Sequence, residues 1–274
     1  RTIVNNLYDR ILNDGCLQVD DYGYWEGCRK AIQEFMELRG VNFNLQKIDT
    51  TGVWFRKPDR FPANPFFVSA LVDEFGELDP VKQGIESQMS ANERFQIFYS
   101  LRKLTAGRSS IVRFVEIGSY SGGSLSLIAK TLKGLGVPVQ GFAVEPGGTQ
   151  QFYQVLQNLN STVHHLKVTS NRAASHLKRL FDLDGNLPEF IMVDGDHSYE
   201  GVRNDIIEYF PLLAPGGLMA FHDFLPPLDE ANRESILSHH GGREPGIRQA
   251  CLELMEGAYG CTALSIPLLY PSDP

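Results

Sequence analysis

Acids and histidines follow two apolar runs in the C-terminal half of the chain. IMVDGDHSYEG places Asp194, Asp196 and His197 after one run, and LMAFHDF places His222 and Asp223 after the next. Carboxylate oxygens suit Mg²⁺, whereas imidazole suits zinc, manganese or iron better. We therefore expect a divalent cation, with Mg²⁺ as the first choice, Asp194 and Asp223 as ligands, and His222 as a further candidate. The alternative is that these acids only cap helix N-termini or bond the loop backbone.

A glycine-rich turn follows an earlier apolar run, in VEIGSYSGGSLSLIAKTL. Glycine lets the backbone turn tightly and approach a ligand, and the helix that follows offers free N–H groups at its N-terminus. The G-x-G-x-x-G spacing of dinucleotide sites is absent, because three other residues separate Gly118 from Gly122 and Gly123. A tight turn that binds no ligand is the alternative.

Two acids near this turn narrow the choice of ligand. Glu116 precedes Gly118 by two residues, and a carboxylate there would repel a phosphate but attract an ammonium group. Glu145 ends the next apolar run, where it could accept hydrogen bonds from a ribose diol. S-adenosylmethionine, which has an amino-acid end and a ribose, fits both acids better than a nicotinamide dinucleotide does.

Strands that alternate with helices must position these residues. The expected strands cover residues 112–118, 139–145, 163–169, 189–194, 217–223 and 261–269. Near-continuous apolar strands separated by helices predict an α/β fold, with a Rossmann-like, doubly wound, mostly parallel sheet covered on both faces. Such sheets bind ligands at the carboxyl ends of their strands, which is where the acids, the histidines and the glycine-rich turn lie.

The chain also contains a partial internal repeat. Residues 7–22 align with 209–224 without a gap, and 27–37 (GCRKAIQEFME) align with 246–256 (GIRQACLELME). The second copy carries an insertion within about 225–245, which is either a loop that covers a substrate or a plain surface loop. Where the second copy has His222 and Asp223, the first has Asp20 and Asp21.

Composition describes an ordinary globular chain. Its 274 residues carry a net charge of -8, with 42% hydrophobic and 21% charged residues. The acidic balance argues against a nucleic-acid partner, no apolar run approaches the ~20 residues of a membrane span, and no signal peptide is visible. Four cysteines without a CxxC pair predict buried, reduced thiols in a cytoplasmic protein. Because the first residue is Arg1, we expect a segment of a longer polypeptide or a trimmed chain.

Taken in order, these motifs resemble those of class I S-adenosylmethionine-dependent O-methyltransferases. VEIGSYSGGS, the acid Glu145, VDGDHSYEG and LMAFHDF after a Pro-Gly-Gly turn are similar to catechol O-methyltransferases and more similar to the macrocin group. The resemblance covers about residues 85–270. VDDYGYWEGCRKAIQEF and IDTTGVWFRK resemble the C-terminal third of a macrocin-type enzyme. We expect a partial methyltransferase tail over 1–57, a linker and gate over 58–90, and a methyltransferase domain over 91–274, within a tandem protein.

The resemblance implies methyl transfer to a hydroxyl group of a small molecule, such as a sugar, glycoside or phenol in natural-product biosynthesis. It implies His197 as the base, with Asp196 as the next candidate, and a solvated loop histidine as the alternative. A nicotinamide-dependent oxidoreductase and a catalytically inactive binding domain are the other functions considered, and a homodimer is compatible with the sequence. The implied cofactor residues are Glu116, Gly118, Ser119, Tyr120, Ser121, Gly122, Ser124, Glu145 and Asp194.

Two flanking segments carry expectations of their own. GIESQMSANERF (84–95) resembles a gate over the cofactor, and Ser90 with Glu93 forms a capping-box pattern that opens a helix. The hairpin that ends in VWFRK (53–57) is expected to pack against a sheet edge, because exposed Trp54 and Phe55 would favour aggregation. The proline-interrupted remainder of 58–90 is expected to be irregular.

Overall fold

The computed structural model divides the chain into two compact units. It describes residues 4, 8, 11, 15–39, 43–57, 65–105, 110–224 and 230–261. One unit comprises residues 1–72 and 263–268, and the other comprises 73–262 and 269–274. The last expected strand, 261–269, lies outside the described residues from position 262 onward.

The first unit is a small sheet with one helix against it. Its described elements are β1 (Cys16–Val19), α2 (Glu26–Arg39), β2 (Gln46–Lys47) and β3 (Val53–Arg56), with the antiparallel strand order β1-β3-β2. Phe55 of β3 is fully buried and stacks on Phe43, with ring centroids 3.9 Å apart. The pairing of β3 with β1 confirms that the hairpin packs against a strand of this chain.

The internal repeat has a structural counterpart. β1 and β8 (Leu218–Phe221) keep the spacing of the aligned sequences, and each strand is followed by an aspartate in the left-handed backbone region. Asp21 has a φ of 57° and Asp223 a φ of 52°, a conformation that aspartate tolerates better than most residues. The same strand and turn are therefore built in both units.

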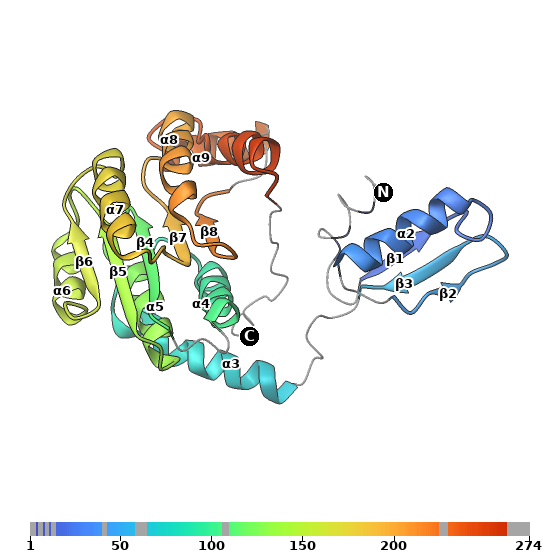
Figure 1. The fold of residues 1–274 in the computed structure, drawn as a ribbon, viewed down its shortest axis with the longest axis horizontal. Coiled ribbons are helices and arrows are strands. Elements are labelled where there is room, and N and C mark those ends of the chain that lie inside the picture. Colours follow the sequence, from blue (N-terminus) through green and yellow to red (C-terminus); the bar gives the residue numbers. More distant parts are fainter. Residues whose placement is uncertain are drawn as a thin grey trace. The chain divides into compact units, whose positions relative to one another are not determined.

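The second unit is an open parallel sheet with the strand order β6-β5-β4-β7-β8 (Figure 1). All four strand pairings are parallel, which confirms the expected α/β, Rossmann-like fold. The strands have the following bounds: β4 (Val112–Ile117), β5 (Val139–Val144), β6 (Val163–Leu166), β7 (Phe190–Val193) and β8 (Leu218–Phe221).

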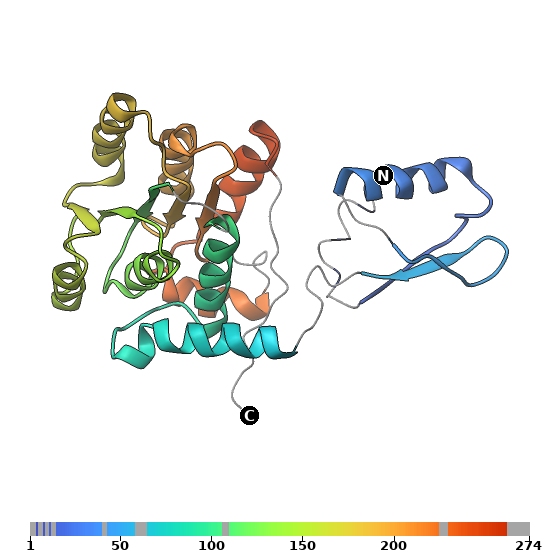
Figure 2. The same cartoon turned by 60° about the horizontal axis from the view of Figure 1, so that its bottom comes forward.

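Helices cover both faces of this sheet (Figure 2). On one face α7 and α8 contribute Leu177, Phe181 and Tyr209 to a buried cluster with strand residues such as Val115 and Ile191. α4 and α5 pack together on the other face. The helices have the following bounds: α4 (Ala91–Thr105), α5 (Gly123–Gly134), α6 (Gln150–Asn158), α7 (Ser170–Asp184), α8 (Tyr199–Tyr209), α9 (Glu230–His239), α10 (Ile247–Ala250) and the π-helix η3 (Cys251–Ala258).

Part of the segment expected to be irregular is helical. α3 runs from Pro65 to Leu78, and the short 3-10 helix η1 (Val81–Gln83) follows it. The prolines of this stretch predicted a segment without regular helix. Pro65, however, stands at the first position of α3, where the backbone N–H that proline lacks would have no partner within the helix. Phe75 of α3 is buried edge-on against Phe95 of α4, with ring centroids 5.3 Å apart.

The insertion and the cysteines also differ from expectation. The insertion is not only a loop, because it contains α9. All four cysteines are free, but only Cys251 is buried. Cys16 is exposed, because alternate residues of β1 face solvent.

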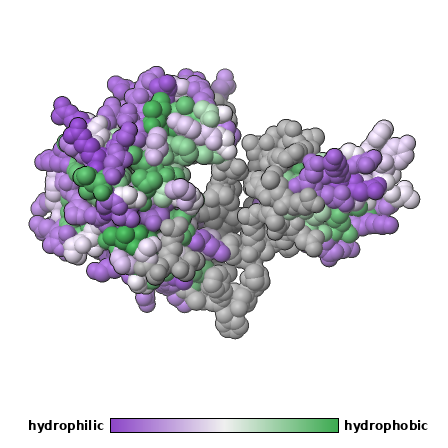
Figure 3. Space-filling model, in the orientation of Figure 1, coloured by the Kyte–Doolittle hydropathy of each residue, from purple (hydrophilic) through white to green (hydrophobic). Residues whose placement is uncertain are grey.

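Hydrophilic residues cover much of the second unit's surface in Figure 3, with hydrophobic residues in separate groups between them. Among the described residues, no helix has the length and apolar character to cross a membrane.

The capping box that opens α4 is confirmed. The Ser90 N–H donates to Glu93 Oε2 at 2.7 Å, and the Glu93 N–H donates to Ser90 Oγ at 3.3 Å. One turn further along, the buried Arg94 guanidinium donates to the Asp79 carboxylate, with Nε and Oδ1 2.8 Å apart. Both contacts fix where α4 begins, and with it the position of Glu93 beside the sheet.

The cap can be tested by its free energy. We expect Ser90→Ala to lower the free energy of unfolding by about 1 kcal/mol, because the Glu93 N–H loses its acceptor and the Glu93 carboxylate loses the Ser90 hydroxyl. Ser100→Ala in the same helix is the matched control. The Ser100 hydroxyl donates to the Gln96 carbonyl, a bond that contributes little to helix stability, so its loss should be near neutral. Urea unfolding followed by circular dichroism measures both, and equal losses would contradict the cap.

Candidate functional site

Four strands of the parallel sheet end at one level. In the pairing register Ile117 lies opposite both Val144 and Val193, and Val193 lies opposite Phe221. The next residue of each strand therefore falls in one row across the carboxyl edge. Along that edge the row reads Glu145, Gly118, Asp194 and His222. The sheet brings together residues that are far apart in the sequence.

Gly118 allows the close approach of two loops in this row. Its φ of 79° lies in the left-handed region, and a Cβ at this position would lie 2.1 Å from the Asp194 carbonyl oxygen. Tyr120 also has a positive φ, of 42°, and Gly122 opens α5 at a φ of 85°. The turn is thus held in a backbone conformation that residues with side chains rarely adopt.

Glu116 is a fully buried carboxyl group beneath this turn. Ser119 Oγ donates to Glu116 Oε2 at 2.5 Å, while Oε1 is buried without a hydrogen-bond partner. Burial raises the pKa of Glu116 to about 8, against the opposing hydrogen bonds from Ser119 and Ser124. An unpartnered, buried acceptor of this kind is costly unless a ligand donates to it. This geometry fits the ammonium group expected from the sequence.

Glu145 ties two loops together. Its Oε2 accepts the N–H groups of Ser119 and Tyr120 at 3.1 and 3.0 Å, and its Oε1 accepts those of Gly147 and Gly148 at 2.9 and 3.1 Å. A carboxylate has about four acceptor positions, so these bonds use all of them. A ribose diol would have to replace some of these donors, and the ribose role of Glu145 stays a prediction.

The segment before α4 closes over the same turn. The Gln151 side chain accepts the Glu86 N–H at 2.9 Å and donates to the Gly84 carbonyl at 2.9 Å. Ser121 Oγ donates to Glu86 Oε2 at 3.2 Å. A Cβ on Gly123 would lie 2.6 Å from the Glu86 carbonyl oxygen, so this approach also requires glycine. The segment thus lies where a gate over the turn was expected.

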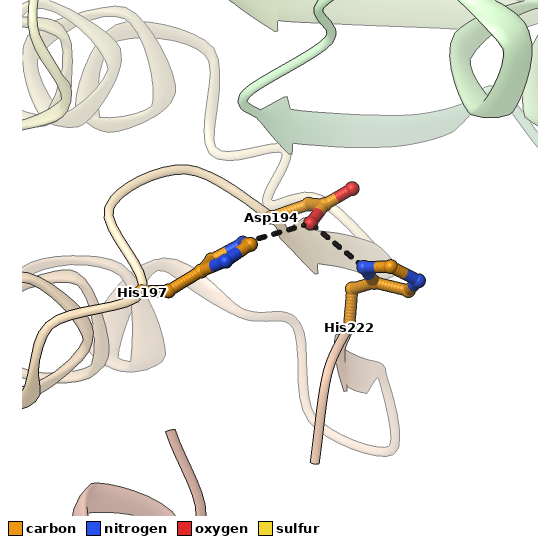
Figure 4. Close-up of side chains that lie close together, drawn as sticks. All are labelled: Asp194, His197 and His222. Carbon is orange, nitrogen blue, oxygen red and sulfur yellow. Dashed lines mark hydrogen bonds and ion pairs between the residues drawn. The ribbon is translucent and has the colours of Figure 1, made fainter. Parts of the chain in front are cut away.

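Asp194 joins two histidines (Figure 4). Its Oδ1 lies 3.2 Å from His197 Nε2 and 3.1 Å from His222 Nδ1. His197 comes from the loop after β7 and His222 from the end of β8, which are neighbouring strands. His222 Nε2 also lies 3.7 Å from Glu93 Oε1 of α4. The structure therefore brings the expected acid and both histidines into one cluster.

Asp223 and His240 extend this cluster on its other side. Asp223 Oδ2 lies 3.5 Å from His197 Nδ1, 3.5 Å from His222 Nδ1 and 3.9 Å from His240 Nε2. His240 Nδ1 lies 3.2 Å from His197 Nδ1. Sequence reasoning missed His240, and its only signal was a His-His pair at the end of the insertion.

Asp196 stands apart from the cluster. Its exposed carboxylate accepts the Ser198 N–H at 2.9 Å, next to the first turn of α8. This is the bonding to the loop backbone that was the alternative for Asp194 and Asp223. Asp196 therefore does not take part in the contacts that join Asp194, His197 and His222.

The cluster attracts positive charge. Burial would lower the pKa of His222, but its hydrogen bonds with Asp194 and Asp223 outweigh burial and raise it to about 10. The hydrogen bond with Asp194 also raises the pKa of His197, and the His222 bond lowers that of Asp223. Burial lowers the pKa of His240. Two carboxylates held together favour a cation, whether an imidazolium or a metal ion.

Two family models match the chain. A model described as a methyltransferase domain matches residues 115–224. The model of the macrocin O-methyltransferases matches residues 2–57, which contain the first copy of the repeat. An uncharacterized protein of Acanthamoeba polyphaga mimivirus is 31% identical over 117 residues, which are 40% of this chain. The match spans about half of that relative, 51% of its length.

Two solved methyltransferase structures have a low similarity to the chain. The methyltransferase PaMTH1 of Podospora anserina, bound to S-adenosylhomocysteine, is 14% identical with a TM-score of 0.41, over 85% of this chain and 88% of that one. The O-methyltransferase NovP is 16% identical with a TM-score of 0.36, over 65% of this chain and 93% of that one. Similarity at this level carries no argument about substrate.

The buried acid predicts a pH dependence of stability. Because the pKa of Glu116 is about 8 in the folded chain and 4.5 as an ordinary glutamate, the folded state holds the extra proton between these values. The unfolded state then binds fewer protons, so the free energy of unfolding falls as pH rises from about 4.5 to 8. Glu116→Gln removes this dependence, and we expect the variant to be the more stable protein at pH 8 by a few kcal/mol.

Urea unfolding of the ligand-free protein between pH 5 and 9 measures this difference. Glu208→Gln on the exposed face of α8 is the matched control and should follow the unmodified protein. Parallel curves for the unmodified protein and Glu116→Gln would show that Glu116 is ionised when buried.

Proposed function

Because the five-stranded unit belongs to the class I S-adenosylmethionine-dependent methyltransferases, we propose that the chain transfers a methyl group from this cofactor to a hydroxyl oxygen of a small molecule. The observation that carries the proposal is the row along the carboxyl edge, where a glycine turn over a buried acid adjoins a cluster of acids and histidines. Sugars, glycosides and phenols are the proposed acceptors. The macrocin-type match of residues 2–57 supports a glycoside among them.

The residues around the glycine turn fit the cofactor. Glu116 Oε1 is buried and lacks a donor, so it would accept from the cofactor's ammonium group. Glu145 would hold the ribose hydroxyls after exchanging some of its loop N–H donors. Gly118 and Gly122 keep side chains out of the turn, and the N-terminus of α5 offers free N–H groups there. Ser119, Tyr120, Ser121 and Ser124 line the same turn.

The acid–histidine cluster fits a divalent ion. Its donors are carboxylate oxygens and imidazole nitrogens from Asp194, His197, His222, Asp223 and His240. A bound divalent ion lowers the pKa of a coordinated hydroxyl and so favours its oxyanion, which is the better nucleophile. The role of His197 as a general base stays a prediction, because both of its ring nitrogens face groups that could also share an ion with it.

A nicotinamide-dependent oxidoreductase is the weaker candidate. Its pyrophosphate would have to approach Glu116, whose carboxylate form would repel it, through a turn that lacks the G-x-G-x-x-G spacing. An inactive binding domain would keep the cofactor turn without turnover. The experiments below separate both from a methyltransferase.

Glu145 gives the sharpest test of the cofactor site. We expect Glu145→Ala to weaken S-adenosylmethionine binding by roughly 1–3 kcal/mol, because the ribose hydroxyls that are buried with the bound cofactor would lose their acceptor. Titration calorimetry with S-adenosylhomocysteine and S-adenosylmethionine measures the change. Glu208→Ala, an exposed acid of α8, should bind as the unmodified protein does. Unchanged affinity in a folded Glu145→Ala variant would remove Glu145 from the site.

The activity itself is tested with labelled cofactor. We expect S-adenosylhomocysteine to bind with measurable heat and NAD⁺ to give none. Transfer of a labelled methyl group to at least one sugar, glycoside or phenol is expected, and EDTA should slow it. If NAD⁺ binds and S-adenosylhomocysteine does not, the proposal is contradicted. Cofactor binding without transfer to any acceptor, with divalent ions supplied, would favour the inactive domain.

A further inference from the structure

His197 belongs to two groups of residues that could each hold a metal ion. One group is Asp194, His197 and His222, and the other is His197, Asp223 and His240. Within each group the potential ligand atoms lie within 4.8 Å of one another. The second group draws on three separate parts of the unit: the loop after β7, the turn after β8, and the residue after α9 in the insertion. The distances and partners of His197 distinguish the two groups.

The spacing around His197 Nδ1 in the second group is close to that of ligands around an ion. Zn²⁺–nitrogen bonds of about 2.0–2.1 Å in a tetrahedron place neighbouring ligand atoms about 3.3 Å apart. The observed separations from His197 Nδ1 are 3.2 Å to His240 Nδ1 and 3.5 Å to Asp223 Oδ2. The other ring nitrogen of His240, Nε2, lies 3.9 Å from the same Asp223 oxygen, and one ion would take only one of the two nitrogens. The two contacts to Asp223 are too long for good hydrogen bonds, which span 2.7–3.2 Å for N–H to oxygen. Hydrogen bonding alone therefore does not account for this convergence.

The partner of the other His197 nitrogen favours the second group. A histidine that binds a metal through one ring nitrogen almost always donates its other N–H to a carboxylate, a carbonyl or water. If His197 binds through Nδ1, its Nε2–H faces Asp194 Oδ1 at 3.2 Å. Asp194 is held in turn by His222 Nδ1 at 3.1 Å. In the first group Nε2 of His197 would itself be the ligand atom, which leaves Nδ1 with Asp223 Oδ2 at 3.5 Å, a contact longer than a good hydrogen bond.

The two copies of the repeat differ at the points that supply imidazole. The first copy has Asp20 where the second has His222, and it lacks the insertion that carries His240. In the second group the insertion adds the imidazole of His240 as a ligand, and the exchange at position 222 removes a carboxylate that could have bound the ion. Such a change moves the preference of a site from Mg²⁺ toward zinc, iron, nickel or copper. Three protein ligands with one position left open is also the arrangement of catalytic zinc sites.

We propose that His197, Asp223 and His240 bind one divalent transition-metal ion, preferring Zn²⁺ to Mg²⁺, and that the insertion serves to supply His240. Asp194 holds His197 in place, and His222 holds Asp194. His197 is then a ligand and does not also act as the general base expected from sequence. This assignment rests on the proposed function only for what the ion does to an acceptor, because metal binding is measured without one.

The test uses the full chain and the metals alone. After removal of metal with a chelator and reloading with Zn²⁺, we expect one Zn²⁺ per chain by elemental analysis. Titration calorimetry of the metal-free protein should give an affinity for Zn²⁺ well above that for Mg²⁺. Co²⁺ should give the visible bands of a four- or five-coordinate site without a thiolate charge-transfer band, which excludes the four cysteines as ligands. One Mg²⁺ bound with no preference for Zn²⁺ would overturn the proposal.

Variants of neighbouring histidines identify the ligand. We expect His240→Ala to weaken Zn²⁺ binding by more than the roughly 10–100-fold that loss of an outer hydrogen-bond partner costs. His239→Ala is the matched control, because His239 is the adjacent residue and its Nδ1 instead faces the Ser235 carbonyl at 2.8 Å. His239→Ala should bind Zn²⁺ normally. If His240→Ala does not fold, as judged by circular dichroism, His240→Gln takes its place.

Variants of His197 and Asp194 distinguish a metal ligand from a general base. We expect His197→Ala to lose Zn²⁺, and Asp194→Asn to keep it with an affinity lowered by roughly 10–100-fold. Full Zn²⁺ binding by folded His197→Ala or His240→Ala would overturn the assignment. S-adenosylhomocysteine binding, measured on the same samples, keeps the two proposals apart. Cofactor binding without a zinc site would refute only the metal assignment, and a zinc site without cofactor binding would refute only the proposed function.

Discussion

The register of a parallel sheet is the constraint on which this site depends. Inter-strand hydrogen bonds align the ends of β5, β4, β7 and β8, so the residue after each strand falls in one row. A slip of one residue in any strand would turn its side chains to the opposite face and break the row. Only because this alignment is rigid can Glu145, Gly118, Asp194 and His222, which lie far apart in the sequence, form one site.

Burial at this edge gives the charges their chemistry. Glu116 faces away from Val115 and Ile117, on the side of the sheet covered by α5, and burial there favours its neutral form. On the neighbouring strands of the same edge, Asp194 and Asp223 lie close together and favour a cation. The two regions suit different ligands, an ammonium group and a metal or imidazolium. One edge therefore presents two adjoining regions that suit different charged groups.

The repeat separates what the fold provides from what the chemistry requires. Both copies build a strand followed by an aspartate in the left-handed region, so backbone geometry alone does not make the cluster. In the second copy the aspartate follows His222, and α9 ends beside His240. The first copy has an exposed acid pair, Asp20 and Asp21, at the same turn. Local structure is thus shared, and the neighbouring side chains decide what each turn can bind.

The sequence by itself determined the α/β class, the described strands, the helix cap at Ser90 and the residues at the strand ends. These are local signals, because apolar runs, glycines and caps act over a few neighbouring residues. Only the tertiary structure decided which side chains meet. Asp196 precedes His197 directly yet bonds Ser198, whereas His240 lies 43 residues beyond His197 and faces it at 3.2 Å. Contacts between distant segments, and the burial that shifts the pKa of Glu116, arise from packing that no short stretch of sequence contains.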